Sequence, residues 1–217
     1  MTQKIIPAIL TSDPEDLRAK LQFFKGESEW MHIDIMDGRF VPNISVSVRD
    51  LLAPEGRAGD FRLEIHLMVQ NPQAYLADCK AVGAARIIIH QEAAGDIEKA
   101  LREMKAYGLQ AGIALNPATP ADAITRYAND IASVLVMAIN PGSQGQEFMP
   151  SVLEKIPAIK KDFPHLLIGV DGGVGEANIS QVLQAGAEYA VVGSKIFEAE
   201  DPVEAFRKLK EKVGIDI

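Results

Sequence analysis

The sequence has few of the features that mark secreted, membrane-bound or nucleic-acid-binding proteins. Its 217 residues include one cysteine, Cys79, which excludes an internal disulfide framework and fits a reducing compartment. No apolar run approaches the ~18 residues of a membrane helix, and the first residues do not resemble a signal peptide. Only 22 basic residues face 30 acidic ones, and this net charge of −8 argues against nucleic acid or an anionic membrane as main partner. We therefore expect a cytoplasmic globular protein.

Short apolar runs alternate along the chain with amphipathic stretches. Each run has the length of a strand, and several are rich in Ile and Val, as strands buried on both faces should be. Apolar spacings of three and four residues, with glycines near the ends, predict helices between them. The runs cover residues 5–10, 31–36, 62–69, 85–90, 110–115, 133–139, 166–172 and 189–197, the last closed by glycine and serine at 193–194.

The repeat of strand and helical connection predicts the fold. Repeated βα units give parallel sheets with right-handed crossovers. Eight such units close most simply into an α/β fold, the (β/α)8 TIM barrel, and 217 residues lies at the compact end of its size range. The alternative, a doubly wound open sheet, rarely needs eight strands in so few residues. No linker or low-complexity tract divides the chain, so we expect one barrel domain over residues 1–217.

Polar side chains interrupt the apolar runs where a barrel places its active site, at the carboxyl ends of the strands. Four residues stand out there: His32, Asp34, His66 and Asp171. His32 and Asp34 are two residues apart, so their side chains share one face of a strand. The isoleucines between and after them then face the outer helices, which places the polar pair inside the barrel. The same alternation turns His66 inward.

The four polar side chains form a donor set that suits a transition metal. An ionised aspartate inside a barrel needs strong compensation, because burying an unpaired charge is costly. One divalent ion held by two imidazoles and two carboxylates would provide it, and such mixed ligands favour Zn²⁺, Fe²⁺, Mn²⁺ or Co²⁺ over Ca²⁺ or Mg²⁺. The alternative is a histidine–aspartate pair satisfied by its own hydrogen bond, without metal. His90 either borders this site or is an ordinary buried histidine.

Glycines gather after the last three strands and indicate an anion site. They occur in residues 140–145, 171–173 and 193–194. Glycine lets backbone N–H groups approach an anion closely, and barrels commonly hold phosphate beside strands seven and eight. Ordinary turn chemistry is the alternative reading. Three inward methionines near the same end either fill the core or wall a substrate pocket: Met36, Met68 and Met137.

Six segments resemble ribulose-phosphate 3-epimerases, in the same order and over nearly the whole chain. The HxDxMDGxFVPN block together with HLM and DGGV is highly specific for that family. Related barrels that decarboxylate orotidine phosphate or act on hexulose phosphates carry a DxKxxD block, whereas this chain has methionine in place of the lysine. The segments are HIDIMDGRFVPN (32–43), EIHLMVQNP (64–72), ALNPATP (114–120), INPGSQGQEFMPSVLEKI (139–156), VDGGV (170–174) and VVGSKIF (191–197).

The resemblance implies a metal-dependent isomerase that epimerises C3 of D-ribulose 5-phosphate to D-xylulose 5-phosphate, in the pentose phosphate pathway. It implies one divalent metal ion, a small phosphosugar as partner, and the ability to form a homo-oligomer. By position, the metal ligands would be His32, Asp34, His66 and Asp171, and the two acid/base groups would be Asp34 and Asp171. The contacts to substrate and phosphate would be His66, Gly142, Ser143, Gln144, Gly145, Gly172, Gly173, Gly193 and Ser194, with Met36, Met68 and Met137 as pocket wall.

Three departures from the family pattern bear on the substrate. Ala8 stands where the family has a serine that contacts substrate, and Ser143 and Gln144 replace phenylalanine and glycine in the loop that follows strand six. They motivate an alternative of the same chemistry, epimerisation at C3 of a ketohexose 6-phosphate such as allulose 6-phosphate. Two alternatives of another class are a sugar-phosphate lyase and a non-catalytic sugar-phosphate binder, although a binder needs no second aspartate.

Overall fold

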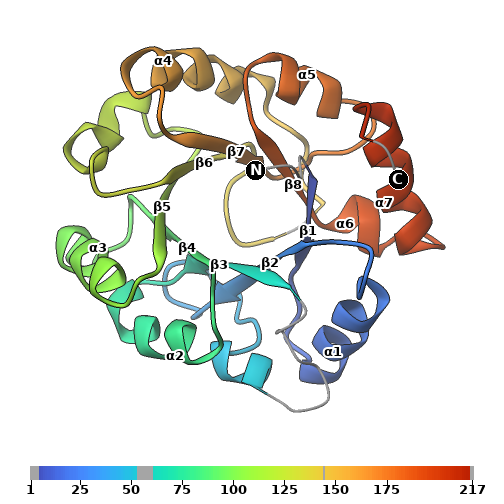
Figure 1. Cartoon of the computed structure of the whole chain (residues 1–217), viewed down its shortest axis with the longest axis horizontal. Helices are drawn as coiled ribbons and strands as arrows, with labels where there is room; N and C mark the ends of the chain where they lie inside the picture. The colour runs from blue at the N-terminus through green and yellow to red at the C-terminus, as the bar shows by residue number, and fades with distance from the viewer. Residues whose placement is uncertain (1–4, 53–60, 144, 216–217) are drawn as a thin grey trace.

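The computed structural model describes residues 5–52, 61–143 and 145–215, and its eight strands form one closed parallel barrel (Figure 1). Each strand pairs with its neighbours in chain order, and β8 closes the ring against β1. The predicted (β/α)8 barrel is therefore confirmed. The strands are β1 (Ile5–Ile9), β2 (Trp30–Met36), β3 (Arg62–Met68), β4 (Arg86–His90), β5 (Gln110–Leu115), β6 (Ser133–Met137), β7 (Leu167–Asp171) and β8 (Tyr189–Val192).

Helices and 3₁₀ turns surround the barrel. Asp13 caps the first helix by accepting a hydrogen bond from the Glu15 N–H at 2.8 Å. The last apolar run divides at Gly193, where β8 gives way to a short helix. The α-helices are α1 (Pro14–Phe23), α2 (Leu76–Ala81), α3 (Ile97–Ala106), α4 (Lys155–Asp162), α5 (Ile179–Gln184), α6 (Ser194–Phe197) and α7 (Pro202–Lys212). The 3₁₀ helices are η1 (Val48–Leu52), η3 (Pro72–Tyr75), η4 (Ala121–Tyr127) and η5 (Pro150–Glu154).

The core has two layers, which follow the alternation of side chains along each strand. Outward side chains such as Ile33, Ile35 and Ile65 pack in one large cluster with the helices. A smaller cluster that includes Ile88 and Leu135 fills the inside of the barrel. Among the residues that the structure describes, no helix is long and apolar enough to span a membrane.

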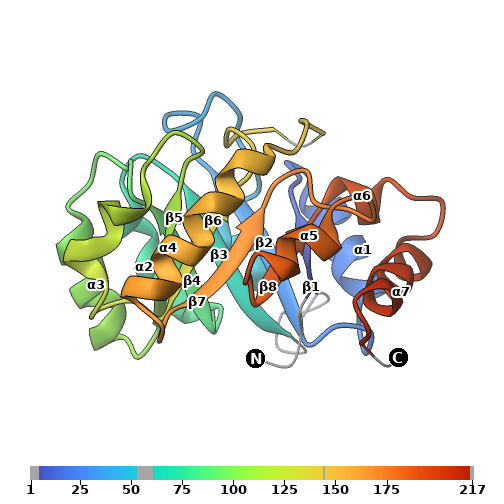
Figure 2. The same cartoon turned by 90° about the horizontal axis from the view of Figure 1, so that it is seen from above.

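The register of β2 and β3 stacks their inward side chains in three levels. His32 pairs with Glu64, Asp34 with His66, and Met36 with Met68. Because the strands are parallel, these pairs rise in order from the interior toward the carboxyl ends. Figure 2 shows that the loops after β2 and β6, blue and yellow, rise above that same end of the barrel. The functional side chains therefore point toward a mouth that two loops cover.

Candidate metal centre and substrate pocket

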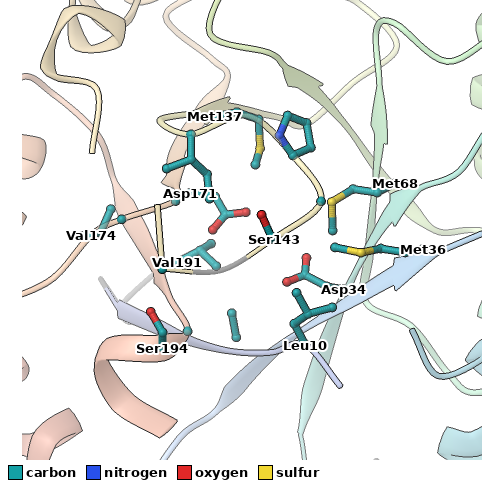
Figure 3. Close-up of a pocket in the computed structure, with 18 residues that line it drawn as sticks. Leu10, Asp34, Met36, Met68, Met137, Ser143, Asp171, Val174, Val191 and Ser194 are labelled. Carbon is teal, nitrogen blue, oxygen red and sulfur yellow. The ribbon is translucent and has the colours of Figure 1, made fainter. Parts of the chain in front are cut away.

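The four polar residues predicted from sequence converge at the mouth of the barrel. His32 and Asp34 come from β2, His66 from β3, and Asp171 ends β7 on the far side of the ring. One ligand atom from each lies within 4.8 Å of the others. Figure 3 shows the carboxylates of Asp34 and Asp171 directed into the same pocket. Strands distant in sequence thus bring two imidazoles and two carboxylates together.

Close contacts bind the cluster around the Asp34 carboxylate. Its Oδ1 lies 2.9 Å from His66 Nδ1 and 3.2 Å from His32 Nε2. Asp171 Oδ2 lies farther from His66 Nδ1, at 3.7 Å. Both imidazoles are fully buried, whereas the side chains of Asp34 and Asp171 are 9% and 15% exposed. The aspartates therefore face the pocket, and His66 lies beneath it.

Each of the two histidines turns one ring nitrogen toward Asp34, and the other nitrogen of each ring has a partner outside the cluster. His32 Nδ1 lies 2.7 Å from Glu64 Oε1. His66 Nε2 lies 2.8 Å from His90 Nε2, and His90 Nδ1 lies 3.3 Å from Glu92 Oε2. Metal-binding histidines commonly have their second nitrogen held this way. The donor atoms and their outer partners fit a divalent transition metal.

The two aspartates differ in their preferred protonation state. Burial alone would raise the pKa of Asp34, but hydrogen bonds with His32 and His66 outweigh it and hold that pKa well below the ordinary range. Burial raises the pKa of Asp171 to about 7, and the negative charge of Asp34 adds to the shift. Environments that shift the pKa values of two carboxyl groups in opposite directions are typical of acid/base pairs.

The imidazoles follow the same electrostatics. Burial favours neutral His32, but hydrogen bonds with Asp34 and Glu64 outweigh it and raise its pKa well above the ordinary value. Burial lowers the pKa of His66, and the hydrogen bond with Asp34 only partly offsets this. Burial likewise lowers the pKa of His90 to about 4, so its ring is neutral near pH 7. Without metal, His32 is therefore cationic between the ionised Asp34 and Glu64, whereas His66 and His90 favour the neutral form; a metal bound at Nε2 of His32 would replace the proton there.

The pocket above the aspartates has about 500 Å³ of space, part of it open to solvent. Ala8 lines it without offering a polar atom from its side chain. Three methionines form part of the wall, as Figure 3 shows: Met36, Met68 and Met137. The residues predicted to contact phosphate that also line it are Gly142, Ser143, Gly145, Gly172, Gly173, Gly193 and Ser194.

Packing alone requires glycine at two of these positions. Gly172 has φ +107°, and a Cβ there would lie 2.3 Å from Ile139 Cγ1. Gly173 has φ +65°, and its Cβ would approach the Phe148 backbone nitrogen to 2.9 Å. Both turns therefore need glycine whether or not phosphate binds. Gln144, also predicted as a phosphate contact, lies outside the described residues.

The two loops above the mouth contact each other. Asn43 Nδ2 donates a 2.6 Å hydrogen bond to the Gly142 carbonyl. Gln146 Nε2 donates to the carbonyls of Asn140 and Ser143, at 2.7 and 2.9 Å. The loop after β2 therefore supports the loop after β6 from one side, and Gln146 braces it from within.

This fold and pocket define a class: a (β/α)8 barrel with a candidate metal centre at the carboxyl ends of its strands. Solved structures of the same architecture include 3-hexulose-6-phosphate synthase from Salmonella typhimurium, with a TM-score of 0.75 and 14% identity over 97% of this chain and 98% of that one. Orotidine 5'-monophosphate decarboxylase from Sulfolobus solfataricus has a TM-score of 0.65 and 15% identity, over 97% and 99%. At these identities the likeness concerns the fold.

Sequence comparison gives the family. The model of the ribulose-phosphate 3 epimerase family matches residues 4–197. The chain is 36% identical to the ribulose-phosphate 3-epimerase of Candida glabrata, over 96% of this chain and 92% of that one. It is 35% identical to that of Bacillus subtilis, over 95% and 98%. The protein belongs to the ribulose-phosphate 3-epimerase family.

Three further residues, Glu64, Arg86 and Glu92, adjoin the site without having been predicted from the sequence, and His90, for which two alternatives were open, borders it. Glu64 and Arg86 are fully buried inside the barrel, below the histidines. His90 stacks on the His66 ring at 4.9 Å between centroids, and Glu92 holds His90. A signal was present, since Glu64 and His66 alternate within an apolar strand as His32 and Asp34 do.

Proposed function

We propose that the protein interconverts D-ribulose 5-phosphate and D-xylulose 5-phosphate by proton transfer at C3, assisted by a divalent metal ion. The observation that carries this proposal is the pair of carboxylates, Asp34 and Asp171, which face one pocket from β2 and β7 and have opposite protonation preferences. Membership in the ribulose-phosphate 3-epimerase family supports the same substrate pair.

Epimerisation beside a carbonyl needs two opposed proton carriers. One group removes the C3 proton, and a second returns a proton to the other face of the planar enediolate. Near pH 7 Asp34 is ionised and can act as the base, whereas Asp171, with a pKa of about 7, still carries a proton in part of the molecules. After one turnover their states are exchanged, so the reverse reaction uses the same pair.

The four clustered side chains would hold one divalent metal: His32, Asp34, His66 and Asp171. When bound, such an ion supplies Lewis-acid stabilisation of negative charge on the substrate oxygens. The donor set of two nitrogens and two oxygens favours Zn²⁺, Fe²⁺, Mn²⁺ or Co²⁺. The buried imidazoles fix the aspartates in place, which keeps the two proton carriers at a set distance from C3.

The glycine-rich side of the pocket would bind the phosphate. Gly142 and Ser143 follow β6, Gly172 and Gly173 follow β7, and Ser194 follows β8. Phosphate held there fixes the sugar relative to both aspartates, so that remote binding energy aligns C3. We also propose a cytoplasmic location, which is consistent with the name of a 36% identical relative from Oryza sativa, a cytoplasmic isoform.

Incubation with D-ribulose 5-phosphate in D₂O tests the proposal. NMR should detect D-xylulose 5-phosphate and deuterium at C3 of the product, and both should disappear after metal is removed by a chelator and return when Zn²⁺ or Mn²⁺ is added. A parallel assay with allulose 6-phosphate tests the ketohexose alternative. Conversion without solvent deuterium at C3, or full activity in a demonstrably metal-free sample, would contradict the mechanism.

A further inference from the structure

A buried carboxylate below the metal centre joins three strands of the barrel. Glu64 on β3 is fully buried and has partners for both of its oxygens. Oε1 lies 2.7 Å from His32 Nδ1 on β2. Oε2 lies 2.6 Å from Arg86 Nη1 on β4 and 3.2 Å from Tyr189 Oη on β8. The group therefore accepts from an imidazole, a guanidinium and a phenol at once.

The surroundings of Arg86 fix the other end of this network. Its guanidinium carbon lies 4.6 Å from the Trp30 ring centroid and 5.2 Å from that of Tyr189. The residue is 1% exposed. A guanidinium has donors and no acceptor, so Arg86 can only donate to Glu64. A carboxylate oxygen must therefore stay turned toward Arg86, and the second oxygen is left for His32.

We infer that Glu64 is a positioning residue for the metal centre, which holds a proton of His32 on Nδ1 so that Nε2 is the nitrogen left to bind the metal. Arg86 and Tyr189 fix the orientation of Glu64. This inference rests on the proposed function, since it concerns the metal that the cluster would hold. In the simpler alternative, the Glu64–Arg86 ion pair only fills and stabilises the barrel interior, and His32 keeps its orientation without it.

Replacement of Glu64 by glutamine distinguishes a role in positioning His32 from a purely stabilising role, because an amide has one acceptor oxygen and one donor nitrogen. In Glu64→Gln the oxygen must face Arg86, so the NH₂ group faces His32 and can only donate to Nδ1. The proton of neutral His32 then moves to Nε2, the nitrogen that should bind metal. Adding Arg86→Met frees the amide to turn: its oxygen accepts from His32 and its NH₂ donates to Tyr189 Oη. The double variant should thus recover what the single variant loses.

Zinc affinity, measured by competition with a chromophoric chelator, is the readout. Glu64→Gln should raise the Kd for Zn²⁺ by roughly 10–100-fold, the usual loss when an outer partner of a ligand is removed. Glu64→Gln/Arg86→Met should regain most of that affinity. Glu188→Gln is the matched control, because Glu188 pairs with Lys160 and accepts from the Ile168 N–H away from the cluster; its Kd should stay that of the wild type. In the zinc-loaded wild type, ¹⁵N NMR should show His32 bound through Nε2 with Nδ1 protonated.

Each outcome decides the matter. Wild-type affinity in Glu64→Gln, equal losses in the single and double variants, or His32 bound through Nδ1 would overturn the positioning role. The NMR result stands on the wild type, so it decides the question even if Glu64→Gln does not fold. An active, zinc-binding wild type with unchanged Glu64→Gln affinity would refute this inference alone, whereas a wild type that binds no divalent metal would refute the proposed metal centre as well.

Discussion

Replacing Asp171 with asparagine should stabilise the metal-free protein at alkaline pH. Burial, reinforced by the charge of Asp34, raises the pKa of Asp171 from 3.8 to about 7 in the folded state. Below pH 3.8 this carboxyl group is protonated in both the folded and the unfolded state, so its raised pKa does not lower the free energy of unfolding. Between pH 3.8 and about 7 the unfolded chain has lost this proton while the folded protein still holds it, so the free energy of unfolding falls as the pH rises, and above pH 7 the full cost of a buried, repelled charge remains. Asparagine never ionises, so the variant escapes that cost.

The size of the effect follows from the shift. Taking 7 − 3.8 as about three pKa units, at ~1.4 kcal/mol per unit, gives an upper figure of ~4 kcal/mol above pH 8. The Asp171 side chain is 15% exposed, so water relieves part of the cost. We expect on the order of 2–4 kcal/mol, which in a chain of this size corresponds to a Tm higher by roughly 5–15 °C.

Thermal unfolding followed by circular dichroism, with a chelator present, provides the assay. The Tm difference between Asp171→Asn and wild type should be small at pH 4, grow steadily up to about pH 7 and level off above pH 8. Asp122→Asn, which changes an exposed aspartate on η4, is the control and should show no such trend. Saturating Zn²⁺ should reverse the order, because the wild type gains more from the ion that its carboxylate binds. A Tm difference that does not change between pH 5 and pH 9 would refute the reasoning.

Three further predictions concern catalysis. Asp34→Asn and Asp171→Asn should each lower the rate of net epimerisation by at least ~10²–10⁴-fold. Each variant should still exchange deuterium into one epimer, and the epimer that exchanges should differ between the two variants. An epimerisation rate near that of the wild type, in either variant that keeps its metal, would exclude the two-base mechanism. His66→Ala should lose bound metal, measured by mass spectrometry, together with activity, while its circular dichroism stays native. Asn43→Ala removes the hydrogen bond to the Gly142 carbonyl, so KM should rise without a change in Tm; an unchanged KM would show that the loop needs no such support.

The sequence was sufficient to predict the fold and to place the four clustered side chains of the candidate metal centre. Alternation alone places His32 and Asp34 inside the barrel and Ile33 outside it, and the structure agrees. Asp171 follows from its position at the end of a strand. These inferences need only the two-residue period of a strand and the rule that barrel sites lie at carboxyl ends.

The partners of those residues required the structure. Glu64 contacts His32 and Arg86 only because the register of three strands puts them level, and a sequence does not state register. The stacking of His90 on His66 is even less accessible to sequence, because the register pairs His66 with Ile88 and His90 lies two residues farther along β4. The apolar run 189–197 misleads for another reason: apolar residues alone do not tell that the chain turns into a helix after Gly193.

The site and the core depend on the same register between β2 and β3. On the outer face, Ile33 pairs with Ile65 and Ile35 with Leu67, all buried against the helices. On the inner face, Asp34 pairs with His66. A slip of one residue would turn an aspartate and a histidine toward the apolar helices and isoleucines toward the pocket. The hydrophobic layer between barrel and helices therefore holds the polar cluster in place, and apolar substitutions on that outer face should affect metal binding as well as stability.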